Sequence, residues 1–231
     1  MVLVNTFRKT GLMTLVAFIH QQWLNIIKWF FRICGKSHLE AIYNDSYFAA
    51  EEEWTKPTAR AVVDIITRHF HPHSLVDVGC GSAVYLHFFH TDGVTIKGYE
   101  GSAAAIQRAK VDSSLIEQVD LTLPIPQPKA YDLAVCFEVA EHLPEISSDT
   151  LVKSLTSLSS CIVFSAAQPG QGGVDHINEQ PWTYWADKFK AQGYKLDDAT
   201  TGRLRKEFGA QGSVWWLEKN LIVVRRSVIS G

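Results

Sequence analysis

Two carboxylates and an imidazole follow an apolar run in the stretch CFEVAEHLPE. Glu138, Glu141 and His142 stand at positions i, i+3 and i+4, so a helical turn would bring them to one face. An imidazole held by a carboxylate can accept the proton of an attacking hydroxyl or amine. The same groups can ligate a divalent metal, or they can cap and fix a loop. The pattern alone leaves these three interpretations open.

A second polar stretch, PGQGGVDHINEQPWTYW, supplies another imidazole. Its glycines allow a mobile loop, and His176 stands among polar residues just before a helix expected to begin at Pro181. Because this loop follows the next apolar run, it should border the same space as His142. A lone histidine in such a loop is usually structural.

The segment VDVGCGSA joins a predicted buried strand to a helix. Gly79 and Gly81, with Cys80 between them, allow a sharp turn and a close approach of the backbone to a ligand. The dinucleotide pattern requires a further glycine where Val84 stands, so the pyrophosphate fingerprint is broken. Asp77 would repel a diphosphate and attract an ammonium or a sulfonium. The turn therefore predicts a ligand that is cationic at this end.

Two further acids end the next two predicted strands. Glu100 closes TIKGYE, where a carboxylate can accept hydrogen bonds from both hydroxyls of a ribose, and Asp120 closes LIEQVD. Each acid alone has a structural explanation; Asp120, for example, could simply begin a turn. Three acids at consecutive strand ends instead fit a nucleoside with a positively charged amino-acid tail. That description is S-adenosylmethionine.

Apolar runs alternate with helix-like segments through most of the chain. The expected strands are SLVDVGC, TIKGYE, LIEQVDL, YDLAVCFEV, CIVFSAA and NLIVVRR, and the helices between them include SAAAIQRAK, DTLVKSLTSLS and PWTYWADKFKAQG. A further helix, with Pro57 in its first turn, should precede the first strand. This alternation predicts an α/β fold with a Rossmann-like doubly wound sheet and helices on both faces. The polar residues above should then meet at the carboxyl edge of that sheet.

In order and spacing, VDVGCGSA, GYEGS, VDL and YDLAVCFEVAEHL resemble the class I S-adenosylmethionine-dependent methyltransferases, over about residues 56–226. The segments FSAAQPGQGGVDHINEQPWTYW and SVWWLEKNLIVVRR resemble a bacterial small-molecule group. Within that group His176 looks like a site residue, so the resemblance ranks it about equal to His142 as a general base or a substrate contact. The resemblance implies a sheet of seven strands, mostly parallel, whose last strand NLIVVRR is antiparallel. This sequence departs from the family's pattern at Ala83, where glycine is more usual, and at Gly101, where an aliphatic residue is more usual. The cofactor contacts that it implies are Asp77, Gly79, Cys80, Gly81, Glu100, Gly101, Ser102, Asp120, Leu121 and Glu138.

The resemblance implies methyl transfer to a small molecule, at oxygen, by in-line displacement with a histidine base. Two alternatives stay open: a scaffold or regulatory subunit that binds S-adenosylmethionine without catalysis, and a nicotinamide-dependent oxidoreductase, which Val84 and Asp77 disfavour. No metal is assigned, although the acids and histidines above are a candidate ligand set. The net charge of −2 gives no reason to expect a nucleic-acid partner.

The prediction divides the chain into an N-terminal segment, residues 1–55, and a methyltransferase domain, residues 56–231. A polar HQQ cluster interrupts the first apolar run, which is therefore a poor membrane span, and no signal-peptide cleavage pattern follows. We expect an amphipathic helix that packs as a substrate lid or lies in a membrane interface, in a cytoplasmic protein or one peripheral to a membrane. Aromatic residues of AIYNDSYFAAEEEW, such as Tyr47, are further candidates to cover substrate. The polar face of the helix carries Gln21, Asn25, Lys28 and Arg32.

Overall fold

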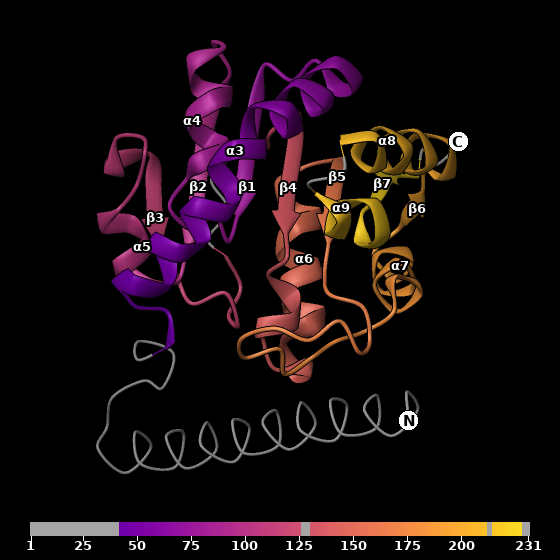
Figure 1. Ribbon diagram of the computed structural model, residues 1–231. Coiled ribbons are helices and arrows are strands. Elements are labelled where there is room, and N and C mark those ends of the chain that lie inside the picture. The colour runs from indigo at the N-terminus through magenta and orange to yellow at the C-terminus, as the bar shows by residue number, and fades with distance from the viewer. Residues whose placement is uncertain (1–41, 126–129, 212–213, 228–231) are drawn as a thin grey trace, which may run out of the picture. The chain divides into compact units, whose positions relative to one another are not determined.

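Seven strands form one sheet in the computed structural model, which describes residues 42–125, 130–211 and 214–227 (Figure 1). Their order in the sheet is β3-β2-β1-β4-β5-β7-β6. Strands β1 to β5 pair in parallel, and β7 is antiparallel to both of its neighbours. This confirms the predicted doubly wound sheet with an antiparallel last strand. The strands are β1 Ser74–Val78, β2 Thr95–Glu100, β3 Ile116–Gln118, β4 Leu133–Phe137, β5 Cys161–Ser165, β6 Tyr194–Leu196 and β7 Ile222–Arg226.

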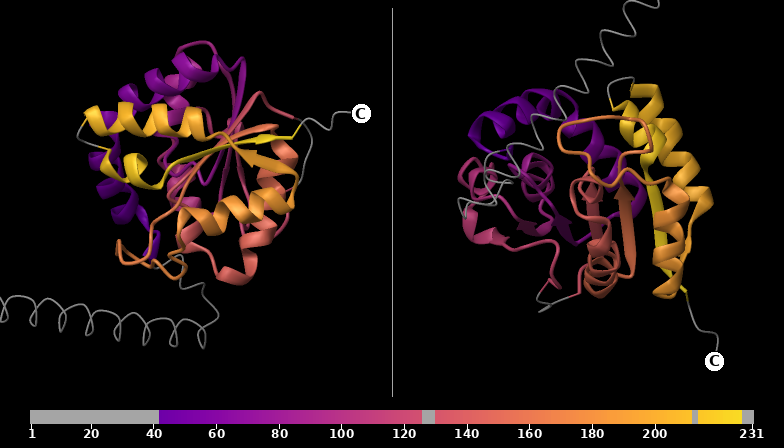
Figure 2. Two further views of the ribbon diagram at one scale, coloured as in Figure 1. Left: turned by 90° about the vertical axis from the view of Figure 1, so that its right-hand side faces the viewer. Right: turned by 90° about the horizontal axis from the view of Figure 1, so that it is seen from below.

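Helices cover both faces of this sheet, as Figure 2 shows. In β1, Leu75 packs in the core formed with α3, α4, α8 and α9, whereas Val76 packs in the core formed with α6 and α7. In β4, Val135 and Ala134 divide in the same way. Burial on both faces explains why these strands appear in the sequence as continuous apolar runs. The α-helices are α3 Asp45–Phe70, α4 Val84–Thr91, α5 Ala103–Gln107, α6 Ser148–Leu158, α7 Trp182–Ala191, α8 Asp198–Gln211 and α9 Trp215–Asn220, and the 3-10 helices are η1 Ser113–Leu115, η2 Ala140–His142 and η3 Glu145–Ser147.

Helix α3 begins earlier than the sequence predicted. The side chain of Asn44 accepts a hydrogen bond from the backbone N–H of Tyr47, which caps the helix ahead of Asp45. Pro57 therefore lies inside the helix rather than in its first turn, and α3 runs through the predicted division between residues 55 and 56. The predicted amphipathic N-terminal helix lies outside the described residues. Within the described part of the chain, no helix is long and apolar enough to cross a membrane.

A buried acid of α3 fixes this helix to the segment around α5. Glu52 is 2% exposed, and its carboxylate pairs with Arg108 Nε at 2.9 Å and with Lys110 Nζ at 2.8 Å. Lys56, one helical turn away, contributes a third pair at 3.1 Å. Burial raises the pKa of Glu52, but hydrogen bonds from these three cations outweigh it and lower the pKa to about 2. The ion-pair network thus holds the first turns of α3 against the segment around α5.

We expect Glu52→Gln to lower the free energy of unfolding at pH 7 by about 1 to 3 kcal/mol, since charge-assisted hydrogen bonds from partly exposed cations are lost. The folded-state pKa lies below the ordinary value of 4.5, so this stabilisation is present above pH 4.5 and is lost as the pH falls toward 2. Thermal unfolding from pH 7 to pH 2 should therefore show a gap of several degrees in Tm that closes in acid. Glu53→Gln, on the exposed side of the same helix, is the control. Equal Tm values for Glu52→Gln and the wild type at pH 7 would contradict the assignment.

Candidate functional site

The turn after β1 is shaped by residues with positive φ. Gly79 has φ 80° and Gly81 has φ 53°, and α4 begins just after Ala83, which also has a positive φ of 59°. A Cβ atom on Gly79 would lie 2.4 Å from Val139 Cγ2, a separation that real side chains do not allow. Only glycine therefore fits position 79, where the turn packs directly against the residue that follows Glu138.

The residues within this turn point in different directions. The backbone N–H groups of Gly79 and Cys80 both donate to Tyr99 O, at 2.8 and 3.3 Å, which fixes the turn to β2. Cys80 is buried, and its Sγ would lie 2.8 Å from a Cβ on Gly98, so the thiol faces the core and its backbone lines the turn. Among the described cysteines, Cys80, Cys136 and Cys161 are free and buried.

Asp77 and Glu100 bring two carboxylates to the turn. Asp77 is 3% exposed, and burial, followed by the charges of Glu100 and Glu51, raises its pKa to about 8. Glu100 accepts hydrogen bonds from Gly81 N at Oε2 and from Ser102 N at Oε1, both at 2.8 Å. The β2 carboxylate thus ties the glycine turn to Ser102, whose hydroxyl caps α5.

The third predicted acid has a different environment. Asp120 is exposed, and its Oδ1 accepts hydrogen bonds from Thr122 N at 2.9 Å and Thr122 Oγ1 at 2.6 Å. These bonds form the turn that the sequence allowed as a structural explanation. Leu121 is buried in the same core as Tyr99, and Gly101 is exposed. A role for Asp120 and Leu121 beside an adenine stays a prediction.

A residue that the sequence did not single out faces the same turn. Glu51 of α3 accepts a hydrogen bond from Thr55 Oγ1 at 2.8 Å through Oε1. Its Oε2 is buried without a hydrogen-bond partner among the described residues, and lies 3.6 Å from the place a Cβ would take on Gly81. Burial raises the pKa of this carboxyl. Phe48 and Thr55 are both buried. Glu51 follows Phe48 by three positions and precedes Thr55 by four, so helical spacing in YFAAEEEWT could have placed this acid on the buried face of the helix.

The end of β4 carries Glu138 in a left-handed backbone conformation, with φ 52°. Its N–H donates to Ser165 O at 3.1 Å, which joins the ends of β4 and β5. Its carboxylate accepts hydrogen bonds from Asn220 Nδ2, at 3.0 and 3.1 Å, and from Gln171 Nε2 at 3.2 Å. The side chain is therefore held toward α9, whereas the backbone lies at the carboxyl edge of the sheet.

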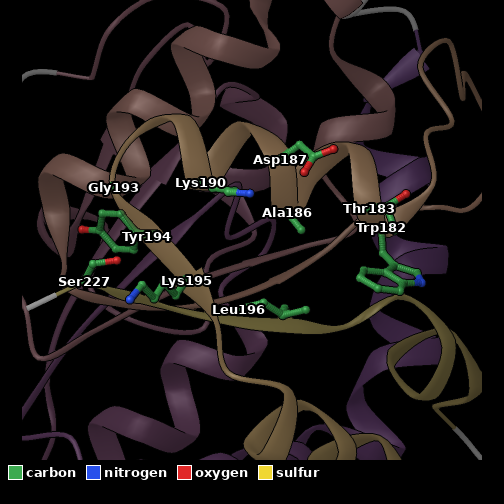
Figure 3. A pocket seen from close by; sticks show the side chains of 10 residues that line it. All are labelled: Trp182, Thr183, Ala186, Asp187, Lys190, Gly193, Tyr194, Lys195, Leu196 and Ser227. Carbon is green, nitrogen blue, oxygen red and sulfur yellow. The ribbon is translucent and has the colours of Figure 1, made fainter.

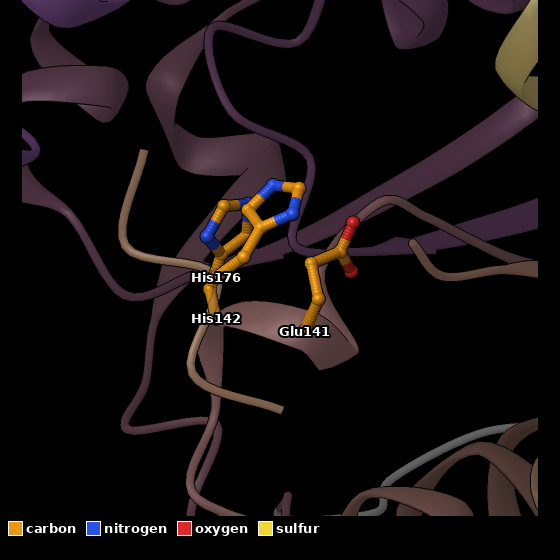
Figure 4. A group of neighbouring side chains, drawn as sticks. All are labelled: Glu141, His142 and His176. Carbon is orange, nitrogen blue, oxygen red and sulfur yellow. The ribbon is translucent and has the colours of Figure 1, made fainter. Parts of the chain in front are cut away.

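Glu141, His142 and His176 come together in one cluster, shown in Figure 4. Each offers a donor atom, and these atoms lie within 4.8 Å of one another. The two imidazole rings meet edge to face, with centroids 4.9 Å apart. Glu141 O accepts hydrogen bonds from Ile177 N at 2.9 Å and Asn178 N at 3.0 Å, which fastens η2 to the loop that carries His176.

The environment of each group in this cluster is set by burial. Glu141 is fully buried, and burial, followed by the charge of Glu138, raises its pKa. Burial, followed by the charge of His176, lowers the pKa of His142 to about 4. The His176 ring is positioned by a hydrogen bond between Nδ1 and Glu179 Oε1, at 3.1 Å. His142 is therefore neutral at ordinary pH.

Glycine at position 173 leaves room for the His176 ring. A Cβ atom at Gly173 would lie 2.2 Å from His176 Nε2, so the ring can occupy this place only beside glycine. Glu179, which binds the ring, also accepts hydrogen bonds from Gly170 N and Gly172 N, both at 2.7 Å. The glycine-rich loop thus wraps around the carboxylate that orients the imidazole.

A pocket of about 400 Å³ lies elsewhere, between α7 and β6 (Figure 3). It contains none of the residues that the sequence predicted as site residues. Its lining is Trp182, Thr183, Ala186, Asp187, Lys190, Gly193, Tyr194, Lys195, Leu196 and Ser227.

The family described as "Methyltransferase domain" matches residues 48–201 of this chain. The ubiquinone biosynthesis O-methyltransferase of Nitrosomonas europaea is 30% identical over 95 residues, which are 37% of this chain and 40% of that protein. The chain thus spans about two fifths of the length of this curated relative. A similarity over this part of each chain indicates that the two proteins are related, but it does not show that they share a substrate.

Solved structures share the fold at low identity. A TehB-like SAM-dependent methyltransferase from Corynebacterium glutamicum is 17% identical, with a TM-score of 0.58 over 80% of this chain and 100% of that one. The magnesium protoporphyrin IX methyltransferase of Synechocystis, solved with bound SAM, is 16% identical, with a TM-score of 0.53 over 74% of this chain and 79% of that one. Both likenesses concern the arrangement of the sheet and its helices.

Proposed function

Because this chain belongs to the S-adenosylmethionine-dependent methyltransferases, we propose that it methylates an oxygen atom of a small molecule with the help of a histidine. The observation that supports the proposal is the close packing of Gly79 against Val139, which connects the acidic glycine turn to the segment that carries Glu141 and His142. The likeness to ubiquinone biosynthesis O-methyltransferases supports oxygen as the acceptor.

The residues around the glycine turn fit a cationic nucleoside. In the described residues, no Lys or Arg forms an ion pair with Glu51, Asp77 or Glu100, and Glu51 Oε2 lacks a hydrogen-bond partner. A positive ligand would satisfy these buried acids, whereas a diphosphate would be repelled. We assign Asp77 and Glu51 to the methionine end of the cofactor.

Glu100 is the residue we assign to the ribose. Its oxygens already accept hydrogen bonds from Gly81 N and Ser102 N, at 2.8 Å each. An ionised carboxylate offers about four lone-pair sites, so each oxygen can accept one more hydrogen bond. The two backbone donors therefore orient Glu100 and leave it able to accept from the two ribose hydroxyls.

The histidines have complementary roles in this proposal. S-adenosylmethionine supplies the methyl group from its sulfonium. His176, whose Nδ1 is engaged by Glu179, presents Nε2 as the proton acceptor for the substrate hydroxyl. His142, neutral because burial lowers its pKa to about 4, accepts or donates a hydrogen bond that positions the same hydroxyl. The first turn of α3 lies close to these groups. Burial raises the pKa of Tyr47 to about 12, and the nearby charges of Glu51, Glu141 and Glu100 add to this rise.

Methyl release from S-adenosylmethionine, measured over a panel of hydroxylated small molecules and matched amines, tests this function. We expect turnover with hydroxyl acceptors and none with amines. Binding of S-adenosylhomocysteine in calorimetry without turnover on any compound would favour the non-catalytic scaffold. Turnover on amines alone would overturn the assignment of oxygen.

Cofactor binding should release protons below pH 8. The pKa of Asp77 is raised to about 8 in the free protein, so below that pH the carboxyl is protonated, and a bound cation lowers its pKa. Affinity for S-adenosylmethionine should therefore rise between pH 6 and pH 8, by up to about tenfold per pH unit. Calorimetry in two buffers of different ionisation enthalpy should report close to one proton released at pH 7. Asp77→Asn should bind more weakly without this proton, and an equal proton release in that variant would exclude Asp77 as the source.

A further inference from the structure

The cluster of Glu141, His142 and His176 combines one carboxylate with two imidazoles (Figure 4). Their donor atoms lie within 4.8 Å of one another. Protein ligands at about 2.0 to 2.2 Å from a zinc-sized ion are at most about 4.4 Å apart, so a small side-chain rotation would complete a coordination sphere. We propose that these three residues bind a divalent cation that prefers mixed nitrogen and oxygen ligands, such as Zn²⁺, Mn²⁺ or Fe²⁺.

The carboxylate of Glu141 is only half satisfied within the protein. Its Oε1 accepts a hydrogen bond from Ala167 N at 3.1 Å. Its Oε2 is buried without a hydrogen-bond partner among the described residues, and the whole side chain is fully buried. A buried oxygen of this kind is costly to leave without a partner. A cation between Glu141 and the two imidazoles would satisfy it.

Both imidazoles have the outer partners that metal-binding histidines use. His176 Nδ1 contacts Glu179 Oε1 at 3.1 Å, which leaves Nε2 available as a ligand. His142 hydrogen-bonds to the backbone in the loop of Val174 and Asp175. A carboxylate or a backbone carbonyl on the far nitrogen fixes the tautomer and the orientation of a ligand ring. The loop around Gly173 therefore supports both ligands from outside.

The charge around the cluster also favours a cation. Glu138 stands three positions before Glu141, and Asp175 is a buried acid directly before His176. Among the residues that the structure describes, no Lys or Arg forms an ion pair with Glu138 or Glu141. Carboxyl groups without a basic partner therefore gather at this edge, and a divalent ion would stabilise them in their ionised form.

This inference deepens the proposed function and rests on it for the role of the cation. Three protein ligands leave coordination positions open, where an acceptor oxygen can bind and become easier to deprotonate. An acceptor with a second oxygen on the neighbouring carbon would occupy two positions and be oriented by both. With the ion bound, the histidines assist as ligands rather than as a base: the cation stabilises the acceptor oxygen while its proton passes to solvent water.

Metal titration of the full chain tests the site without any need for activity. After treatment with a chelator and dialysis, Zn²⁺ binding by calorimetry and Co²⁺ binding by visible absorption should each show one site per chain. Glu141→Gln and His176→Ala should each lower the affinity at least about 100-fold, since loss of an outer partner alone costs 10- to 100-fold. His90→Ala, an exposed histidine on α4, is the matched control and should bind as the wild type does. Unchanged S-adenosylhomocysteine affinity in the variants shows that they are folded.

The outcomes separate this inference from the proposed function. A wild type without a Zn²⁺ or Co²⁺ site, or with a site that survives in both ligand variants, would overturn the inference. Methyl transfer at the full rate in excess chelator would overturn the role of the cation and leave O-methylation intact. One stoichiometric metal site in a protein that methylates no hydroxylated compound would support the ligand set and defeat the proposed function.

Discussion

Replacing Glu100 by alanine should lower the affinity for S-adenosylhomocysteine by about 10² to 10⁴. Two ribose hydrogen bonds to a carboxylate are lost, at about 1.5 to 3 kcal/mol each, and tenfold in affinity corresponds to about 1.4 kcal/mol. The backbone N–H groups of Gly81 and Ser102 also lose their acceptors, so the turn is no longer oriented. Calorimetry measures the loss directly. Thermal unfolding with and without ligand should show that the stabilisation by S-adenosylhomocysteine has disappeared.

Two further variants distinguish ribose binding from damage to the turn. Glu100→Gln keeps the shape and one acceptor oxygen, so its affinity should lie between those of the wild type and of Glu100→Ala. Glu117→Ala removes an acid from β3, the strand next to β2, where the side chain pairs with Lys97. That control should bind as the wild type does. Wild-type affinity in Glu100→Ala would refute the ribose assignment.

The His176→Ala variant should lower kcat by about 10² to 10⁴, the usual contribution of a general base. His142→Ala should also lower kcat, because the second imidazole positions the same hydroxyl. The dissociation constant for S-adenosylhomocysteine should change little in either variant, since the assigned cofactor contacts lie at the glycine turn. Single-turnover methyl transfer with saturating cofactor measures the effect. Unchanged turnover in both variants would exclude a histidine base.

The pH dependence of kcat identifies which imidazole acts as the base. A base must be neutral, so the rate rises with pH through its pKa and then levels off. The pKa of His142 is lowered to about 4 by burial and by the charge of His176, so a base at His142 would give an acid limb near pH 4. An acid limb that disappears in His176→Ala would assign the proton transfer to His176. A limb near pH 4 that persists in His176→Ala would assign it to His142.

Local patterns in the sequence were sufficient for the sheet and for the glycine turn. The run TIKGYE coincides with β2, Thr95–Glu100, because both faces of a central strand are buried and the apolar period is visible over six residues. Asp77 and Glu100 could be placed together because the carboxyl ends of neighbouring parallel strands share one edge. By contrast, β6, Tyr194–Leu196, was missed. It has three residues, as β3 has, but it lacks the apolar neighbours that extend the pattern of β3 in LIEQVDL.

The contents of the site were decided by contacts between distant segments. Glu51 faces Gly81 only because α3 begins at Asp45, where Asn44 caps it, and folds over the turn. Likewise, the meeting of His142 with His176 depends on backbone hydrogen bonds from the β5–α7 loop to Glu141 O.

From the sequence alone, the strands, the sharp turn and the acids at the strand ends follow, because each depends on neighbours a few positions away. Tertiary structure alone decided that Glu138 turns toward Asn220, 82 positions further on, and that Glu141 is fully buried with one unpaired oxygen. Both depend on the paths of loops, and loop paths are fixed by packing between segments that leave no periodic trace in the sequence. The sequence therefore predicted the edge of the sheet at which the cofactor should bind, and the fold determined which side chains lie near that edge.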